Sequence, residues 1–285
     1  MLQCFGGEAL LAWDVLRETF AYAHQLAKKR KKEILFILSS NGMSLTEEIL
    51  KELSQYPIKL ELSLDGDSDT QNRFRRALLK SDDSYEQGIA NKAHLIQKYT
   101  PFHEVIMVVH PEIVHKMSSN FCHIAALGFK RIQINYGQGY IWTKPQKECF
   151  SKELMRIATF LRKEWLQGID IMLINLEAEP QPMRLNGEIT IDWDGSIHGG
   201  NSFLHKNSRS EILQFGYLDD GLSFDRCWMD MPENALIQEC TYSPEVTKNN
   251  IAVGNIFASF IRWMRKQGIG PQSKNATLSS IRPST

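Results

Sequence analysis

Short apolar runs alternate with helical patterns along the first half of the chain, and this alternation limits the fold more than any other feature. Each run is four to six residues long and ends in polar or turn-forming residues, as β-strands do. The first predicted strand ends near Phe5, and the others cover residues 34–38, 59–64, 105–109 and 131–136. Helices are predicted between them, at about residues 9–29, from 46 onward, at 84–99 and at 118–127. Strand–helix–strand repeats predict parallel strands wound in one hand, in an open sheet or a barrel.

Polar side chains recur where these predicted strands end. In parallel α/β folds the carboxyl ends of the strands lie at one edge, where active sites form. One polar residue after a strand is most often a turn former, but five successive turns that carry them favour a site. The residues concerned are Glu8, Asn41, Ser63, Asp65, His110 and Asn135.

The first of these turns is Gly6-Gly7-Glu8, which leads from a strand into a helix. Two glycines allow a ligand to approach the backbone, and the glutamate places a carboxylate beside the N–H groups of the first helical turn. This turn suits a small zwitterion that has both an amine and a carboxylate. The alternative is a strand–helix turn that needs glycine only for its dihedral angles.

Composition excludes several classes of partner and location. The 285 residues include 33 Lys plus Arg and 33 Asp plus Glu, so no net field favours nucleic acid or an anionic membrane. No apolar run reaches the roughly 18 to 20 residues that span a bilayer, and no signal peptide is visible. We therefore expect a cytoplasmic protein that binds neither nucleic acid nor a membrane.

The second half has a different pattern. A helix is predicted at residues 150–167, a strand at 171–174, a hairpin at 188–198 around an Asp-Gly turn, and a closing helix at 251–266. The polar tail is expected to be disordered. The predicted divisions are a barrel region at 1–145, a C-terminal α+β region at 146–270 and a tail at 271–285.

Five segments of the first half resemble, in order and spacing, the core of radical S-adenosylmethionine (SAM) enzymes, particularly those with a SPASM or twitch extension. They are FGGEALL, ILSSNG, LELSLDGDSDTQNRFRR, the apolar strand before His110-Pro111, and GFKRIQINYG. The resemblance implies an α/β fold: an incomplete parallel (β/α)6 partial TIM-type barrel, with a C-terminal α+β extension of the SPASM or twitch kind.

The resemblance also implies a binding site for SAM. Gly6, Gly7 and Glu8 match the turn that binds the amino group of SAM. Asn41 stands at the position of a Thr-Asn-Gly motif, while Ser63 and Asp65 match a Ser-x-Asp-Gly turn that faces the methionine carboxylate and the ribose. Asn135, on the fifth strand, completes the expected cofactor-binding set.

The chain departs from the family at its iron–sulfur ligands. Family members hold a [4Fe–4S] cluster with a Cys-x3-Cys-x2-Cys loop after the first strand, and the resemblance places that strand, loop and helix before Met1. The five cysteines are scattered, at positions 4, 122, 149, 227 and 240. Gly199-Gly200-Asn201 stands where an auxiliary-cluster cysteine would be expected. No metal ligands are predicted, because the set His198, His205, Cys227 and Cys240 fits no standard zinc spacing.

Two functions remain open from the sequence. The first is a protein derived from a radical SAM enzyme that modifies a peptide or protein, here without the cluster-binding cysteine loop. The second is a degenerate, non-catalytic relative that binds a peptide or SAM as a partner subunit. Either way, a barrel open at its first strand exposes an edge, and a protein partner is expected to cover it.

Overall fold

The computed structural model describes residues 1–76, 83–177, 189–198, 214–222 and 242–267. The chain forms two compact units. The first draws on residues 1–137, 144–177 and 259–285, and the second on residues 138–143 and 178–258. The predicted disordered tail and three of the residues weighed as metal ligands, His205, Cys227 and Cys240, lie outside the described residues.

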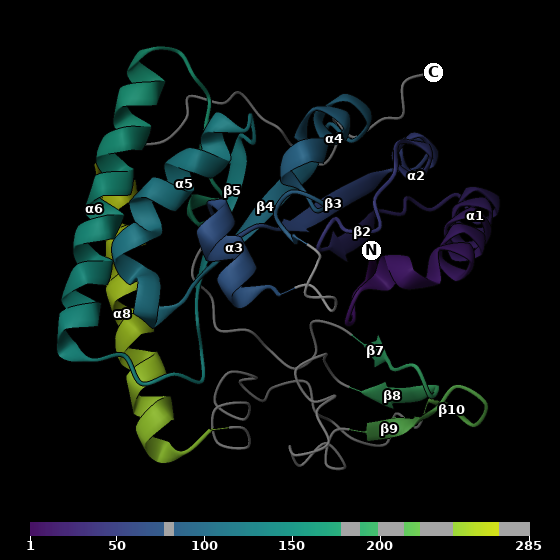
Figure 1. The fold of residues 1–285 in the computed structure, drawn as a ribbon. Helices are drawn as coiled ribbons and strands as arrows, with labels where there is room; N and C mark the ends of the chain where they lie inside the picture. Colours follow the sequence, from purple (N-terminus) through teal and green to yellow (C-terminus); the bar gives the residue numbers. More distant parts are fainter. Residues whose placement is uncertain (77–82, 178–188, 199–213, 223–241, 268–285) are drawn as a thin grey trace. The chain divides into compact units, whose positions relative to one another are not determined.

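The first unit is built on a six-stranded sheet in which every pair of neighbouring strands is parallel. Helices alternate with the strands, so the predicted α/β barrel-type fold is confirmed (Figure 1). The strands follow one another in space as they do in sequence. They are β1 (Leu2–Cys4), β2 (Phe36–Ser40), β3 (Ile58–Ser63), β4 (His103–Val109), β5 (Arg131–Tyr136) and β6 (Met172–Leu173).

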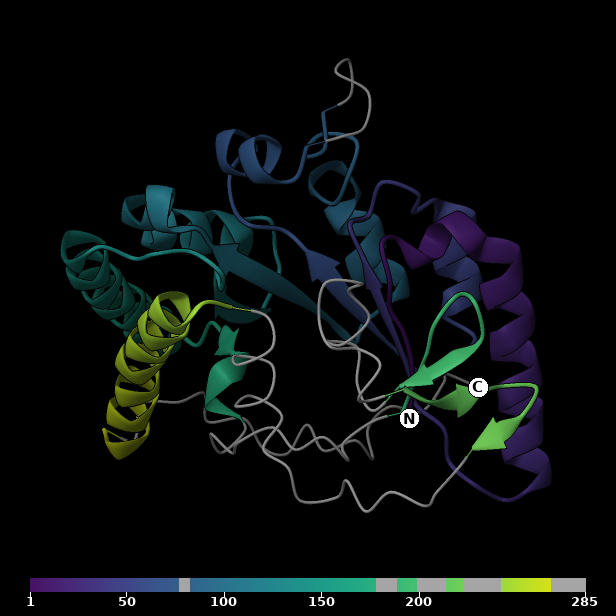
Figure 2. The same cartoon turned by 90° about the horizontal axis from the view of Figure 1, so that it is seen from below.

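Helices α1 to α5 lie along one side of this sheet (Figure 2). Alternate strand residues that face them are apolar and fully buried, as Leu60 and Leu62 are on β3. Phe20 on α1 packs against Phe36 of β2 with ring centroids 4.9 Å apart. The helical elements are η1 (Ala9–Ala12), α1 (Trp13–Lys29), α2 (Glu47–Leu53), α3 (Ser68–Phe74), η2 (Ala90–Lys92), α4 (Ala93–Tyr99), η3 (Pro111–Lys116), α5 (Met117–Ala126), α6 (Lys144–Leu166) and η4 (Ile174–Leu176).

Two of these elements differ from the sequence prediction. Helix α3 was not predicted, because its buried residues are the polar Thr70 and Gln71 and give no apolar periodicity. The predicted helix at 84–99 is helical only from residue 90. Before that, Asp83 accepts hydrogen bonds from the backbone N–H groups of Tyr85 and Glu86, so a side-chain turn replaces the first helical turns.

Residues 146–177, which the sequence analysis placed with the C-terminal region, contribute to the sheet of the first unit. Helix α6 leads into β6, which pairs in parallel with β5 through Arg131 and Ile132. The second unit contains a four-stranded antiparallel sheet in the order β10-β9-β8-β7. Its strands are β7 (Thr190–Ile191), β8 (Ser196–His198), β9 (Gln214–Tyr217) and β10 (Gly221–Leu222). Helix α8 (Pro244–Lys266) belongs to this unit up to residue 258 and to the first unit from residue 259.

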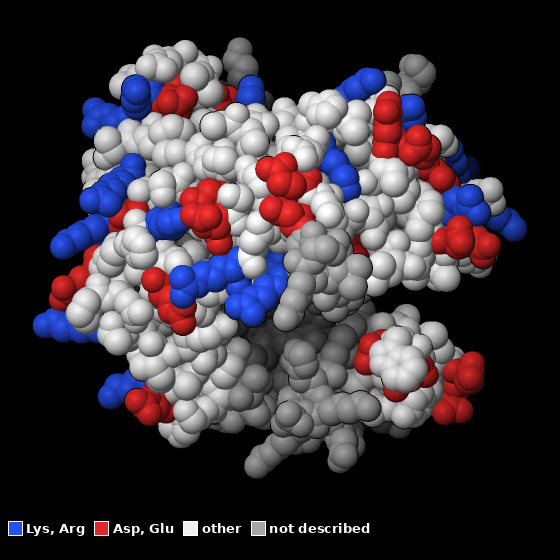
Figure 3. Space-filling model, viewed as in Figure 1, with Lys and Arg blue, Asp and Glu red and all other residues white. Residues whose placement is uncertain are grey.

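The predicted hairpin is confirmed in this second sheet. β7 pairs with β8 across Asp194-Gly195, and Gly195 has a φ of +81°, which glycine adopts without strain. None of the described helices is both long and apolar enough to cross a membrane. On the face seen in Figure 3, acidic and basic side chains are interspersed, in keeping with the balanced composition.

Gly66 follows the third strand and has no room for a side chain. Its φ is +149°, and an added Cβ would lie 2.2 Å from Cγ of Asn120. Asn120 is itself buried and accepts hydrogen bonds from the backbone N–H of Asp67 and from the Thr70 hydroxyl. Any substitution must therefore displace a side chain that holds the start of α3.

We predict that Gly66→Ala lowers the free energy of unfolding by about 3 kcal/mol, because backbone strain adds to the loss of the Asn120 contacts. Urea denaturation measures the change. Gly7→Ala is the matched control, since no heavy atom lies within 4 Å of a Cβ added there. Equal stability of the two variants would contradict the steric argument.

Candidate functional site

The residues expected to bind a ligand lie at the carboxyl edge of the parallel sheet. The register aligns the strand ends: Cys4 is opposite Leu38, Ser40 is opposite Leu62, and Val108 is opposite Asn135. The turn after β1, the turn after β2 and the end of β3 therefore open on the same edge. The residues that were predicted as a site lie at or just after these strand ends: Gly6, Gly7, Glu8, Asn41, Ser63, Asp65 and Asn135.

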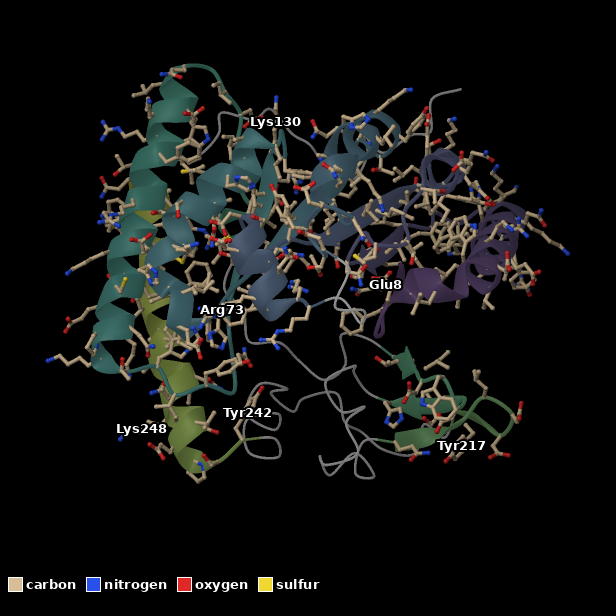
Figure 4. The ribbon with its side chains drawn as sticks, in the orientation of Figure 1. Glu8, Arg73, Lys130, Tyr217, Tyr242 and Lys248 are labelled. Atoms are coloured by element: carbon tan, nitrogen blue, oxygen red, sulfur yellow. The ribbon has the colours of Figure 1, made fainter. Side chains whose placement is uncertain are left out.

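Glu8, labelled in Figure 4, joins the first turn to the end of the second strand through hydrogen bonds. Its Oε1 accepts hydrogen bonds from the backbone N–H of Leu10, at 3.2 Å, and from the Ser40 hydroxyl, at 3.0 Å. Its Oε2 accepts from the backbone N–H of Asn41, at 2.8 Å. Three donors thus fix the carboxylate. Ser40 was not among the predicted site residues, although it stands in the visible Ser39-Ser40-Asn41-Gly42 turn.

Open space surrounds the two glycines that precede Glu8. A Cβ added at Gly6 or Gly7 would meet no heavy atom within 4 Å, and Gly6 has a φ of +153°. The backbone is therefore accessible to a ligand at this turn. A carboxylate offers about four lone-pair positions, so the three donors on Glu8 leave room for one more, such as an ammonium group.

Lys92 supports the turn that carries Asn41. Its ammonium group donates to the carbonyl oxygens of Gly42, at 2.8 Å, and Met43, at 3.0 Å. Burial lowers the pKa of Lys92. The Asn41 side chain also stabilises this turn, since its Oδ1 accepts from the backbone N–H of Met43 at 2.9 Å. The amide NH2 group of Asn41 is not used by this bond.

Asp65 is the anchor of the third turn. Its Oδ2 accepts from Nε of Arg75, at 2.7 Å, and its Oδ1 accepts from Nη2 of Arg75, at 3.0 Å, and from the backbone N–H of Val108, at 2.9 Å. Only 5% of the Asp65 side chain is exposed. The two oxygens therefore connect the turn after β3 to the end of α3 and to β4. Arg75 was not among the predicted site residues, and its only signal in the sequence is its place in the charged segment after Asp65.

Ser63 and Asn135 have their own hydrogen-bond partners, apart from the Glu8–Asn41 pair. The carbonyl oxygen of Ser63 accepts from Nε2 of Gln71, at 3.2 Å, and the same glutamine accepts from the backbone N–H of Asp65. Asn135 accepts from Nε2 of Gln133, at 3.0 Å. His110, after β4, stacks on Phe74 with ring centroids 4.3 Å apart. Hydrogen bonds therefore connect Ser63 to Asp65 and Asn41 to Glu8.

A charged network crosses the sheet on the face opposite the apolar one. Lys59 lies between two glutamates, with Nζ 2.6 Å from Oε1 of Glu61 and 2.8 Å from Oε1 of Glu104. Ser39 donates to Glu61 at 2.8 Å, and Arg131 lies 3.9 Å from the far oxygen of Glu104. The side chains of Glu61 and Glu104 are only 11% and 5% exposed. The inner face of the sheet therefore carries a buried charged network around Lys59, beside apolar residues such as Ile37 and Ile106, whereas its outer face is apolar.

The pKa of Lys59 reflects two opposed causes. Burial alone would lower it, but hydrogen bonds with Glu104 and Glu61 favour the charged form and the pKa is raised. The stabilisation that follows is fully present below the unfolded lysine pKa of about 10.4, and it is lost as the pH rises through the higher folded value. The ion pairs are thus complete at neutral pH.

We predict that Lys59→Met lowers the free energy of unfolding at pH 7 by about 3 kcal/mol, because it leaves two buried carboxylates facing each other. Denaturant unfolding measures the loss, and adding Glu104→Gln should restore part of it. Lys51→Met is the matched control: Lys51 forms an exposed pair with Glu47, so its loss should leave stability almost unchanged. A Lys59 variant as stable as the control would show that the network adds nothing to stability.

The described cysteines do not form a cluster site. Cys4 lies on β1, Cys122 on α5 and Cys149 on α6, and burial raises the pKa of the Cys4 thiol to about 11. Within the described ranges, no three His, Cys, Asp or Glu side chains stand together as a set that could hold a metal ion. These residues therefore do not fit a [4Fe–4S] cluster.

The parallel sheet, its helices and the turn-rich edge define an α/β fold of the partial TIM-barrel type, and solved structures share this fold. Two solved structures show the likeness directly. Tagged anSMEcpe with bound AdoMet has a TM-score of 0.73 and 16% identity, over 98% of this chain and 83% of that one. Native anSMEcpe with bound AdoMet and Cp18Cys peptide has a TM-score of 0.70 and 17% identity, over 93% of this chain and 83% of that one.

Other comparisons give no closer relation. No protein-family model matches the sequence, and no curated protein matches it. At 16–17% identity, the two solved structures establish the fold alone.

Proposed function

We propose that this chain is a radical SAM-like protein, derived from an enzyme that modifies a peptide or protein, and that it binds SAM at the carboxyl edge of its sheet. The observation that carries the proposal is the open Gly6-Gly7 turn beside a fixed Glu8 carboxylate. The likeness to anSMEcpe supports it, because that protein was solved with AdoMet and with a peptide.

In this proposal each residue has a distinct task. Glu8 accepts a hydrogen bond from the ammonium group of SAM, while Gly6 and Gly7 let the amino acid part approach the backbone. Asn41 and Ser63 offer polar groups along the edge, and Asn135 closes the set on β5. Asp65 acts indirectly, since both its oxygens are bonded to Arg75 and Val108 and position the third turn. SAM supplies a sulfonium centre whose cleavage needs an electron, and the described residues provide no cluster for that step.

We expect the purified chain to bind SAM in isothermal titration calorimetry, and Glu8→Gln to weaken binding at least about tenfold, because a charge-assisted hydrogen bond is lost. Gly7→Val should abolish binding by filling the open turn, where an added Cβ meets no heavy atom within 4 Å. Glu33→Gln, an exposed glutamate before β2, is the matched control and should bind normally. Binding that survives both site variants would place SAM elsewhere or reject the proposal.

A second candidate function is a non-catalytic partner subunit that binds a peptide or SAM without radical chemistry. The positions of Cys4, Cys122 and Cys149 on three separate elements favour it.

Anaerobic iron–sulfur reconstitution separates the two candidates. The second predicts a colourless protein that still binds SAM or a peptide in calorimetry. A brown protein that cleaves SAM when reduced would support the enzyme instead, because a bound cluster absorbs visible light and delivers the electron.

A further inference from the structure

The direction of the Glu8 carboxylate depends on the turn after β2. The Ser40 hydroxyl donates to Oε1 of Glu8 at 3.0 Å, and the backbone N–H of Asn41 donates to Oε2 at 2.8 Å. Ser40 is only 3% exposed, and its oxygen accepts from the backbone N–H of Gly42 at 3.0 Å. The next peptide group of the turn therefore orients the hydroxyl that orients Glu8.

A second segment, which ends where α4 begins, holds this turn in place. The ammonium group of Lys92 donates to the carbonyl oxygens of Gly42 and Met43, at 2.8 and 3.0 Å. Ile89 is 1% exposed and lies so close that a Cβ added at Gly42 would be 2.6 Å from its Cγ1. Gly42 also has a φ of +79°. The turn is thus bound by a cation and packed against an apolar side chain, so it has little freedom to change shape.

The partners of Lys92 suggest more than support for the fold. Within the described residues, its ammonium group bonds to two backbone carbonyl oxygens and to no carboxylate. A half-buried charge without a counter-charge costs free energy that an apolar side chain at the same place would not. In return, a charged donor holds a carbonyl oxygen more firmly than a neutral donor does. The arrangement therefore favours a fixed turn shape over stability alone.

We propose that Lys92 is a positioning residue for the Glu8 carboxylate and acts through the turn after β2. Lys92 fixes the carbonyl oxygen of Gly42, and the N–H of Gly42 orients the Ser40 hydroxyl. That hydroxyl in turn orients Glu8. The inference rests on the proposed function, in which Glu8 receives the ammonium group of SAM. Loss of the lysine then weakens SAM binding, although Lys92 itself does not touch SAM.

Isothermal titration calorimetry of the full chain with SAM tests this inference. Lys92→Met should weaken SAM binding at least about tenfold, because the turn that orients Glu8 loses its charged support. Lys98→Met is the matched control: this exposed lysine on α4 undergoes the same change of charge, and the variant should bind SAM as the wild type does. Circular dichroism checks that each variant is folded.

Combination with Glu8→Gln separates positioning from a general effect on the fold. If Lys92 acts through Glu8, Lys92→Met should cost less than about a factor of two in affinity once Glu8 is already replaced, because coupled residues are not additive. Independent effects would multiply instead. Folded Lys92→Met with normal SAM affinity, or an equal loss of affinity in both backgrounds, would overturn the inference.

Ser40→Ala covers the case in which Lys92→Met does not fold, since it removes only the hydroxyl that lies between the turn and Glu8. It should show the same pattern, with weaker SAM binding when Glu8 is present and little further loss with Glu8→Gln. Normal binding by Ser40→Ala and by Lys92→Met would reject this inference alone. A wild-type chain that does not bind SAM would reject the proposed function, and this inference with it.

Discussion

The parallel register of the first five strands is the constraint on which the rest of the first unit depends. Each strand pairs with the next in the same direction, so each following turn opens at the same edge. Side chains then hold these turns in place. The Glu8 carboxylate fixes the first turn against the second, and the Asp65 carboxylate fixes the third against Arg75 and β4. Two carboxylates therefore shape the edge: Glu8 lies beside the open Gly6-Gly7 turn, whereas the side chain of Asp65 is buried.

The sequence predicted the elements whose apolar pattern is strong. The runs at 34–38 and 105–109 became β2 and β4, and the helix at 9–29 became η1 followed by α1. The prediction failed where polar side chains replace an apolar pattern. Helix α3 buries Thr70 and Gln71, and the segment from Asp83 to Glu86 forms a side-chain turn. Periodicity carries no information about such segments, because hydrogen bonds rather than apolar burial stabilise them.

The positions of the candidate site residues could be predicted from the sequence, but the hydrogen-bond partners of their side chains could not. Strand ends identified Glu8, Asn41, Ser63 and Asp65 because the carboxyl edge follows from parallel topology. The sequence could not show that Asp65 is engaged by Arg75, since that pairing depends on where α3 ends. Nor could it show that Ser40 donates to Glu8 across 32 residues. Long-range contacts of this kind depend on tertiary packing, which residue order alone does not specify.

The charged network on the inner face has a consequence for how the sequence can vary. Lys59 lies between Glu61 and Glu104, so the loss of this lysine leaves buried carboxylates uncompensated on two strands at once. Substitution of Lys59 alone is therefore expected to be rare among related sequences. Among relatives that share this sheet, positions 59, 61 and 104 should covary, and the loss of the lysine should be accompanied by the loss of a carboxylate on β3 or β4.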